Sequence, residues 1–114
     1  MHEYSLIQSL VTRVESEARA RRASSVHRVV VALGELSGVD PELFAIAYDT
    51  FRAGTLCEGA PLEVRRVEAR WSCPGCGREI HRGQVLACDA CRVPARLAPG
   101  GDEIVLETIE MEVP

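Results

Sequence analysis

The sequence has few aromatic residues, and this scarcity limits what can build its core. One Trp, two Tyr and two Phe occur among 114 residues, although hydrophobic residues make up 46% of the chain. That hydrophobic fraction is ordinary for a globular protein and argues against disorder of the whole chain. We therefore expect one modest domain, with or without a small metal-stabilised lobe, whose core is built from Val, Leu, Ile and Ala.

The chain also lacks an apolar stretch long enough to span a bilayer. Its first residues, MHEYSL, show neither the basic nor the apolar region of a secretion signal. We therefore expect a soluble cytoplasmic protein with no membrane partner. In that reducing compartment, cysteines bind metals more often than they form disulfides.

Basic residues are fewer than acidic residues, which gives a net charge of −4. All 13 basic residues are arginine. Binding to nucleic acid needs a basic surface, so the total argues against a nucleic-acid partner. Five arginines nevertheless lie between residues 70 and 96, against only Glu79 and Asp89. They would suit an anionic metal centre there, although a solvated basic loop explains them nearly as well.

The first third of the chain predicts a helix followed by a strand. The helix should end between residues 21 and 25, and residues 26–36 then alternate with a period of two, as in a central strand covered on both faces. Residues 34–38 form a turn rich in Gly and Ser. The apolar stripe of the helix comprises Leu6, Ile7, Leu10, Val11, Val14 and Ala18.

A second helix is predicted to begin after Asp40. Asp40 is a capping residue, Pro41 suits the first helical position and Glu42 suits the positive end of the helix. Gly54 is a natural terminator. The expected apolar face comprises Leu43, Phe44, Ala47, Tyr48 and Phe51.

Two further strands flank a cysteine-rich segment. Residues 62–71 alternate with a change of phase at Arg65–Arg66, where we expect a bulge, and residues 104–113 form the last strand. We expect these strands to be antiparallel neighbours. The predicted fold is α+β, with two helices packed on a small three-stranded sheet and an inserted zinc-knuckle lobe. Its α/β domain is residues 1–70 plus 101–114, and its lobe is residues 71–100.

Four cysteines form two CxxC pairs, Cys73/Cys76 and Cys88/Cys91, separated by 11 residues. A two-residue spacer in a tight turn lets both sulfurs of a pair reach one ion, and two such pairs complete a tetrahedral zinc shell. A closed shell of four sulfurs leaves no position for substrate water, which favours structural zinc over catalytic zinc. Iron, as in rubredoxin, is accepted by the same ligands and stays an alternative.

Three other side chains have plain structural interpretations. Cys57 lies far from both pairs, and we expect a free, half-buried thiol. His27 falls in a strand pattern and is expected to be structural. His81 lies in the loop between the knuckles, where an exposed histidine is a better expectation than an extra metal ligand.

The N-terminus offers a second, separate metal site. The amine of Met1, the amide nitrogen and imidazole of His2, and the amide nitrogen of Glu3 are four nitrogens that one ion can reach through small chelate rings. Planar nitrogen sets favour Ni²⁺ or Cu²⁺ over Zn²⁺. The amine has a reference pKa of about 8, and the adjoining helix start disfavours its protonated form. His2 as an ordinary exposed histidine is the alternative.

Taken together, these segments resemble the HypA/HybF family of hydrogenase-maturation nickel metallochaperones. The resemblance covers essentially the whole chain: MHEYSL, VALGELSGVDPELFAIAYDTFRAGT, EGAPLEV, the paired CxxC knuckles and EIVLETIEMEV. It implies an α/β nickel domain plus a zinc lobe, with transferable Ni(II) at His2. It also implies zinc on Cys73, Cys76, Cys88 and Cys91.

The same resemblance implies partners. Family members deliver nickel to the hydrogenase large subunit with a HypB-type GTPase, and in some bacteria also toward urease. A homodimer is left open, as are the nickel affinity and the recipient enzyme. One departure from the family pattern is visible, because the second knuckle often reads Cys-Pro-x-Cys followed by a small polar residue, whereas Asp89 and Arg92 stand here.

Two other functions are alternatives to nickel delivery. A zinc-ribbon module that binds nucleic acid or protein would use the arginines beside the cysteines, with Trp71 for stacking, but the acidic total and sparse aromatics oppose it. An iron electron carrier would be coloured as isolated. No Ser/His/Asp set, phosphate loop or carboxylate pair stands out, so we expect no enzyme.

Overall fold

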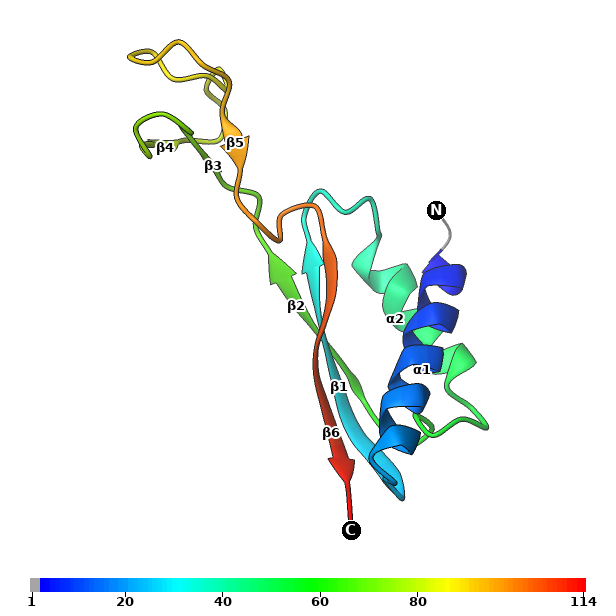
Figure 1. The fold of residues 1–114 in the computed structure, drawn as a ribbon. Helices are drawn as coiled ribbons and strands as arrows, with labels where there is room; N and C mark the ends of the chain where they lie inside the picture. The colour runs from blue at the N-terminus through cyan, green and yellow to red at the C-terminus, as the bar shows by residue number, and fades with distance from the viewer. Residues whose placement is uncertain (1–2) are drawn as a thin grey trace.

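The computed structural model describes residues 3–114, and Met1 and His2 lie outside the described residues. Its shape is elongated, with extents of 56 × 29 × 17 Å (Figure 1). Two helices and a three-stranded sheet form the helix–sheet region, and a smaller sheet beyond one end belongs to the cysteine lobe, residues 71–97. The expected α+β fold is confirmed. The elements are α1 (Glu3–Ala20), β1 (Ser25–Gly34), α2 (Pro41–Phe51), β2 (Leu62–Val67), β3 (Trp71–Ser72), β4 (Glu79–Ile80), β5 (Arg96–Leu97) and β6 (Ile104–Glu112).

Helix α1 packs its apolar stripe against the sheet. Its buried residues are Ile7, Val11, Val14 and Ala18, at the helical spacing that the sequence predicts. The helix ends where expected, because Arg22 takes a left-handed φ of 56° and the N–H of Ala23 donates to the carbonyl of Ala18 at 2.9 Å. Neither helix within residues 3–114 has the combination of length and apolarity needed to cross a membrane.

Helix α2 begins as predicted. The carboxylate of Asp40 accepts hydrogen bonds from the backbone N–H groups of Glu42 (2.9 Å) and Leu43 (3.2 Å), which caps the helix. The helix ends at Phe51, three residues before Gly54. The prediction that Leu43 faces the core is wrong, because its surface is 51% exposed. The buried residues are Phe44, Ala47 and Tyr48, so the apolar face is narrower than the sequence pattern indicated.

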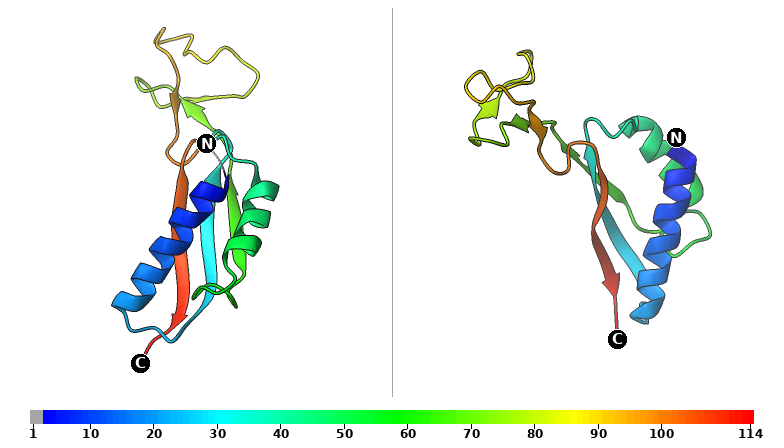
Figure 2. Two further views of the ribbon diagram at one scale, coloured as in Figure 1. Left: turned by 90° about the vertical axis from the view of Figure 1, so that its right-hand side faces the viewer. Right: turned by 45° about the horizontal axis from the view of Figure 1, so that its top comes forward.

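The main sheet has the order β2-β1-β6, with both helices on one face (Figure 2). β1 pairs with β2 in parallel and with β6 in antiparallel fashion. The expectation that the two strands flanking the lobe are neighbours is therefore wrong, because β1 lies between them. The physical reason is the helical crossover: α2 carries the chain from β1 back to a parallel neighbour, which leaves the other edge of β1 for β6.

The bulge expected at Arg65–Arg66 is also wrong. The β1–β2 register runs unbroken from Val29↔Leu62 to Gly34↔Val67, and the irregularities lie instead in the β1–β6 pairing. Arg66 breaks the alternation because it lines a cleft at the end of the sheet. The strand also ends earlier than predicted, since Trp71 already belongs to β3 in the second sheet.

The central strand β1 is buried on both faces, as expected, but different kinds of side chain cover the two faces. Val29 and Val31 belong to the main core cluster on the helical side. On the other face, the ion pair Arg65–Glu107 runs from β2 to β6 across β1, with its shortest N···O distance 2.6 Å. Arg65 stands beside the buried Ala32 in the sheet register. Long charged side chains from the neighbouring strands therefore shield this face.

The lobe is joined to the sheet at a tight backbone crossing. A Cβ placed on Gly34 would lie only 2.4 Å from the carbonyl oxygen of Gly100 and 2.5 Å from that of Gly101. The turn after β1 also donates backbone hydrogen bonds to the end of β2 and to the segment that precedes β6, from Glu35 to Val67 and from Leu36 to Gly101, each at 2.8 Å. Glycine is therefore required at residue 34 by close approach of the backbone.

Candidate metal centre

The four cysteines of the two CxxC pairs come together in the lobe. Their sulfur atoms all lie within 4.8 Å of one another, and the Sγ atoms of Cys76 and Cys88 are 3.9 Å apart. A tetrahedral ion with Zn–S bonds of about 2.3 Å would place its sulfurs about 3.8 Å apart. The donor set and its spacing therefore fit one zinc ion, held by Cys73, Cys76, Cys88 and Cys91.

The two knuckles repeat one backbone turn. The N–H of Gly77 donates to the carbonyl of Cys73, and the N–H of Arg92 donates to the carbonyl of Cys88, both at 2.8 Å. The residue after each CxxC pair is left-handed, with φ 78° at Gly77 and 55° at Arg92. The first knuckle meets this requirement with glycine, whereas the second imposes it on an arginine, which is strained there.

Backbone N–H groups inside each knuckle point at a buried sulfur. Cys73 Sγ accepts from the N–H groups of Gly75 (3.3 Å) and Cys76 (3.4 Å), and Cys88 Sγ accepts from that of Cys91 (3.4 Å). The N–H of Cys76 is the main cause that lowers the pKa of Cys73. The N–H of Cys91 is the main cause that lowers the pKa of Cys88 to about 6. Both sulfurs thus favour the thiolate form that binds metal.

Crowding of the sulfurs has the opposite effect on the fourth ligand. The neighbouring sulfurs, first that of Cys73 and then that of Cys76, raise the pKa of Cys91 to about 12. Four thiolates so close together need a divalent cation to ionise completely. One positive charge is already nearby, since the Arg78 guanidinium lies 3.5 Å from Cys88 Sγ. The excess of arginine between residues 70 and 96 was the only sequence signal for this contact.

The predicted nickel site falls mostly outside the described residues. Met1 and His2 are not described, and Glu3 is the first residue of α1. The Glu3 carboxylate accepts a long hydrogen bond (3.5 Å) from the backbone N–H of Asp40, the cap of α2. Glu3 is thus placed where the starts of the two helices meet.

The remaining side chains that we singled out lie away from the sulfur cluster. His81 is exposed, and its Nδ1 lies 3.5 Å from Glu79. His27 is exposed and pairs with Glu112 at 3.4 Å. Cys57 is fully buried in the helix–sheet core rather than half-buried. Burial raises the pKa of its thiol, so it stays protonated and unreactive.

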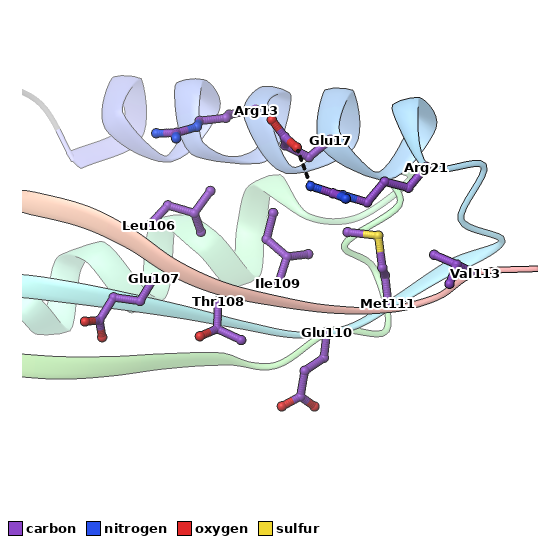
Figure 3. A pocket seen from close by; sticks show the side chains of 10 residues that line it. All are labelled: Arg13, Glu17, Arg21, Leu106, Glu107, Thr108, Ile109, Glu110, Met111 and Val113. Atoms are coloured by element: carbon purple, nitrogen blue, oxygen red, sulfur yellow. Dashed lines mark ion pairs between the residues drawn. The ribbon is translucent and has the colours of Figure 1, made fainter.

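A groove of about 680 Å³ lies between α1 and β6, and none of the four cysteines lines it (Figure 3). Arg13, Glu17 and Arg21 line one wall, and Glu17 pairs with Arg21 at 3.6 Å. Leu106, Ile109 and Met111 point from β6 toward α1. The groove contains no cysteine or histidine side chain, so we do not assign it to the metal centre.

Comparison with known proteins places this arrangement in one family. A family model described as "Hydrogenase/urease nickel incorporation, metallochaperone, hypA" matches residues 1–111. The chain is 38% identical over 114 residues to the hydrogenase maturation factor HypA of Aquifex aeolicus (strain VF5), covering 99% of each. It is 36% identical to the HypA of Wolinella succinogenes, covering 98% of this chain and 96% of the relative.

Solved structures agree in fold over the full length. The solution structure of the Ni metallochaperone HypA from Helicobacter pylori matches with a TM-score of 0.73 and 31% identity, covering 100% of both chains. A second structure, titled "Solution structure of HypA protein", matches with a TM-score of 0.77 and 31% identity, covering 97% of this chain and 96% of the other. The resemblance predicted from the sequence is confirmed, and the chain belongs to the HypA family.

Proposed function

We propose that this chain is a nickel metallochaperone, which binds Ni(II) at its N-terminus and delivers it for maturation of [NiFe]-hydrogenase or of urease. The observation that carries the proposal is the family match over residues 1–111, which includes both the N-terminal Met-His-Glu and the four cysteines. The clustered sulfurs support a division of labour, in which one metal is held permanently and another is transferred. Delivery of an ion requires no catalysis by this chain.

The cargo site is formed by Met1, His2 and Glu3. Their amine, amide and imidazole nitrogens provide a planar set that suits Ni²⁺. A site formed by the chain terminus and the first residue of α1 can release its ion more readily than a closed shell of four protein ligands. The sulfur site differs in kind: Cys73 and Cys88 are buried, all four ligands are protein sulfurs, and zinc there supplies folding free energy to the lobe.

A role in hydrogenase maturation requires partners in that pathway, and we propose two of them. A HypB-type GTPase would exchange nickel with this chain, and the hydrogenase large subunit would receive it. Both steps take place in the cytoplasm. The acceptor must reach residues 1–3, so it contacts the surface where α1 and α2 begin, beside Glu3 and Asp40.

Nickel titration of untagged, zinc-loaded protein with its native start tests the site. His2→Ala should abolish the binding and remove the absorption of a planar nickel complex. His27→Ala and His81→Ala are matched controls, because both side chains are exposed and lie outside the N-terminus. These two variants should bind as the wild type does.

A second variant tests the free amine independently of the imidazole. One extra residue before Met1 converts the amine into an amide and should weaken nickel binding as strongly as His2→Ala does. Unchanged affinity in His2→Ala would overturn the site assignment. A wild-type protein that ignores Ni²⁺ with zinc in place would overturn the proposed function itself.

A further inference from the structure

The junction between the helix–sheet region and the cysteine lobe contains contacts beyond the chain connections. Two connecting segments, residues 68–70 and 98–103, join these parts (Figure 1). Backbone hydrogen bonds attach the turn after β1 to the last residue of β2, Val67, and to Gly101 in the second of these segments. These bonds fix where the lobe is attached, but they leave its direction to contacts made by the lobe itself.

One side chain of the lobe makes such a contact. Arg82, in the loop between the two knuckles, donates to both carboxylate oxygens of Glu35 in the turn after β1. The Nη1–Oε2 distance is 2.7 Å and the Nη2–Oε1 distance is 2.5 Å. Paired, charge-assisted hydrogen bonds of this kind fix direction as well as distance, because guanidinium and carboxylate are both planar.

The same pair also holds one of the connecting segments. Arg82 Nη2 donates to the carbonyl oxygen of Ala69 (3.2 Å), and the N–H of Ala69 donates to Oε1 of Glu35 (2.9 Å). Ala69 is buried and follows β2 in the connection to the lobe. Glu35, Ala69 and Arg82 therefore form one closed network, which we call the junction clamp.

An aromatic contact ties the clamp to the metal-binding cluster. The guanidinium carbon of Arg82 lies 5.9 Å from the ring centroid of Trp71, which is within the range of a cation–π contact. Trp71 in turn packs against the buried cluster of Cys73, Ile80 and Cys88. The position of Arg82 thus depends on the lobe being folded around its cysteines.

Exposure limits how much the clamp contributes to stability. The side chains of Arg82 and Glu35 are 52% and 40% exposed, and an isolated ion pair of that kind is worth little. The pair of Glu35 and Arg82 differs from an isolated ion pair in its bidentate geometry and in the two hydrogen bonds that it makes with Ala69. Hydrogen bonds from Arg82 and from the N–H of Ala69 lower the pKa of Glu35 to about 2. The contribution of the pair to stability is therefore full above about pH 4.5, the ordinary pKa of a glutamate, and is lost as the pH falls from there through about 2, where the folded-state carboxylate is protonated.

We propose that Glu35 and Arg82 are positioning residues that hold the folded cysteine lobe in one orientation at the end of the main sheet. The clamp also closes one side of a cleft of about 400 Å³, lined further by Val39 and Pro41 at the start of α2. Glu3 contacts the same end of α2 through Asp40. The lobe is thereby held at the end of the sheet where Glu3, the described residue of the proposed nickel site, lies. That last consequence rests on the proposed function, whereas the orientation itself does not.

Residual dipolar couplings of backbone amides in the zinc-loaded, nickel-free protein test the orientation. In the wild type, one alignment tensor should fit the couplings of both the helix–sheet region and the lobe. In Arg82→Gln, each part should still fit a tensor, but one common tensor should no longer fit. Glu35→Gln should have the same effect. In the wild type, 1 M salt should do so in part, because the Debye length is then about 3 Å.

Two further variants distinguish the effect of losing the clamp from the effect of losing a positive charge. Arg70→Gln is the matched control, since Arg70 pairs only weakly with Glu68 (3.5 Å) and Glu79 (3.7 Å) and does not reach Glu35; it should keep a common tensor. The double reversal E35R/R82E should restore one orientation only in part, because the reversed pair keeps the charge attraction but loses both hydrogen bonds with Ala69. Emission from Trp71, the only tryptophan in the chain, should shift in Arg82→Gln and not in Arg13→Gln, which lies on α1.

The proposal is overturned if Arg82→Gln retains a common tensor, or if the wild type already needs two. It is also overturned if Arg70→Gln loosens the lobe as much as Arg82→Gln does. Zinc content is measured in every variant, so that a lobe without metal is not mistaken for a reoriented one. Because no nickel is used, failure here leaves the proposed function standing, and failure of the nickel titration leaves the clamp standing.

Discussion

The helix–sheet region and the cysteine lobe are held together by different means. In the helix–sheet region, the buried cluster includes side chains of both helices and of β1, among them Ile7, Val31 and Tyr48. In the lobe, the buried cluster contains only Cys73, Ile80 and Cys88. Its strands are two residues long, too short to stabilise a sheet by themselves.

The difference between the two buried clusters indicates where the folding free energy of each part comes from. Burial of apolar surface, worth about 25 cal/mol per Å², suffices for a core of the first kind. It does not suffice for the lobe, two of whose three buried residues are metal ligands. Binding of zinc therefore takes over the role that apolar packing plays in the helix–sheet region.

Removal of the zinc should have the largest effect, and it tests whether the two parts are stabilised by different means. Chelation should unfold the lobe, since structural zinc contributes an apparent ~10–16 kcal/mol in small domains. The helix–sheet region should stay folded. Amide spectra recorded before and after chelation should lose dispersion for residues 71–97 and keep it for α1 and β1. A metal-free lobe with dispersed signals would contradict the comparison.

The reverse experiment removes apolar packing and leaves the metal. Ile7 is fully buried in the main cluster, so Ile7→Ala should lower the free energy of unfolding by about 2–5 kcal/mol. Chemical denaturation measures this loss, and the zinc content should not change. Ile46→Ala is the matched control: Ile46 is 60% exposed, so its loss should stay within about 0.5 kcal/mol.

The third prediction concerns the hydroxyl of Tyr48, the one buried tyrosine among the described residues. Tyr48 donates to the carbonyl oxygen of Ala60 at 2.7 Å, and Arg52 donates to the same oxygen at 2.9 Å. Tyr48→Phe therefore leaves that carbonyl satisfied and should cost only about 0.5–1.5 kcal/mol in thermal or chemical unfolding. A loss above about 3 kcal/mol would mean that the arginine contact does not survive without the hydroxyl.

The smallest expected effect compares the two knuckles with each other. Arg92→Gly should relieve left-handed strain and tighten zinc binding by up to about fivefold, or about 1 kcal/mol. Gly77→Ala should weaken it by a similar amount, because it introduces the same strain into the first knuckle. Competition with a chromophoric chelator measures both. Equal affinities in all three proteins would show that backbone strain in the knuckles does not reach the metal.

Local chemistry made several features predictable from the sequence. The spacing of the cysteines predicted the sulfur cluster, because a two-residue spacer directs both sulfurs to one point. Asp40 and Pro41 predicted the start of α2, since capping depends on neighbouring residues only. The apolar period of α1 predicted its buried face for the same reason.

Features that depend on distant parts of the chain were not predictable in this way. The pairing of β1 with both β2 and β6 is decided by the helical crossover, not by any residue in the strands. The contact between Glu35 and Arg82 joins residues 47 positions apart, and neither residue type is unusual in its segment. Leu43 looks like a core residue in the pattern and is exposed, because α2 buries only a narrow face.

The central place of β1 has a consequence for anyone who wishes to excise the lobe. Val67 and Ile104, the ends left by a cut, lie on opposite sides of β1, beside Gly34 and Leu33. Two strand spacings separate them, about 9.6 Å, whereas a two-residue hairpin turn joins only adjacent strands. A bridge that replaces residues 68–103 must therefore span at least about three extended residues and pass over the end of β1. A minimal nickel-binding protein derived from this chain needs that bridge, not a simple turn.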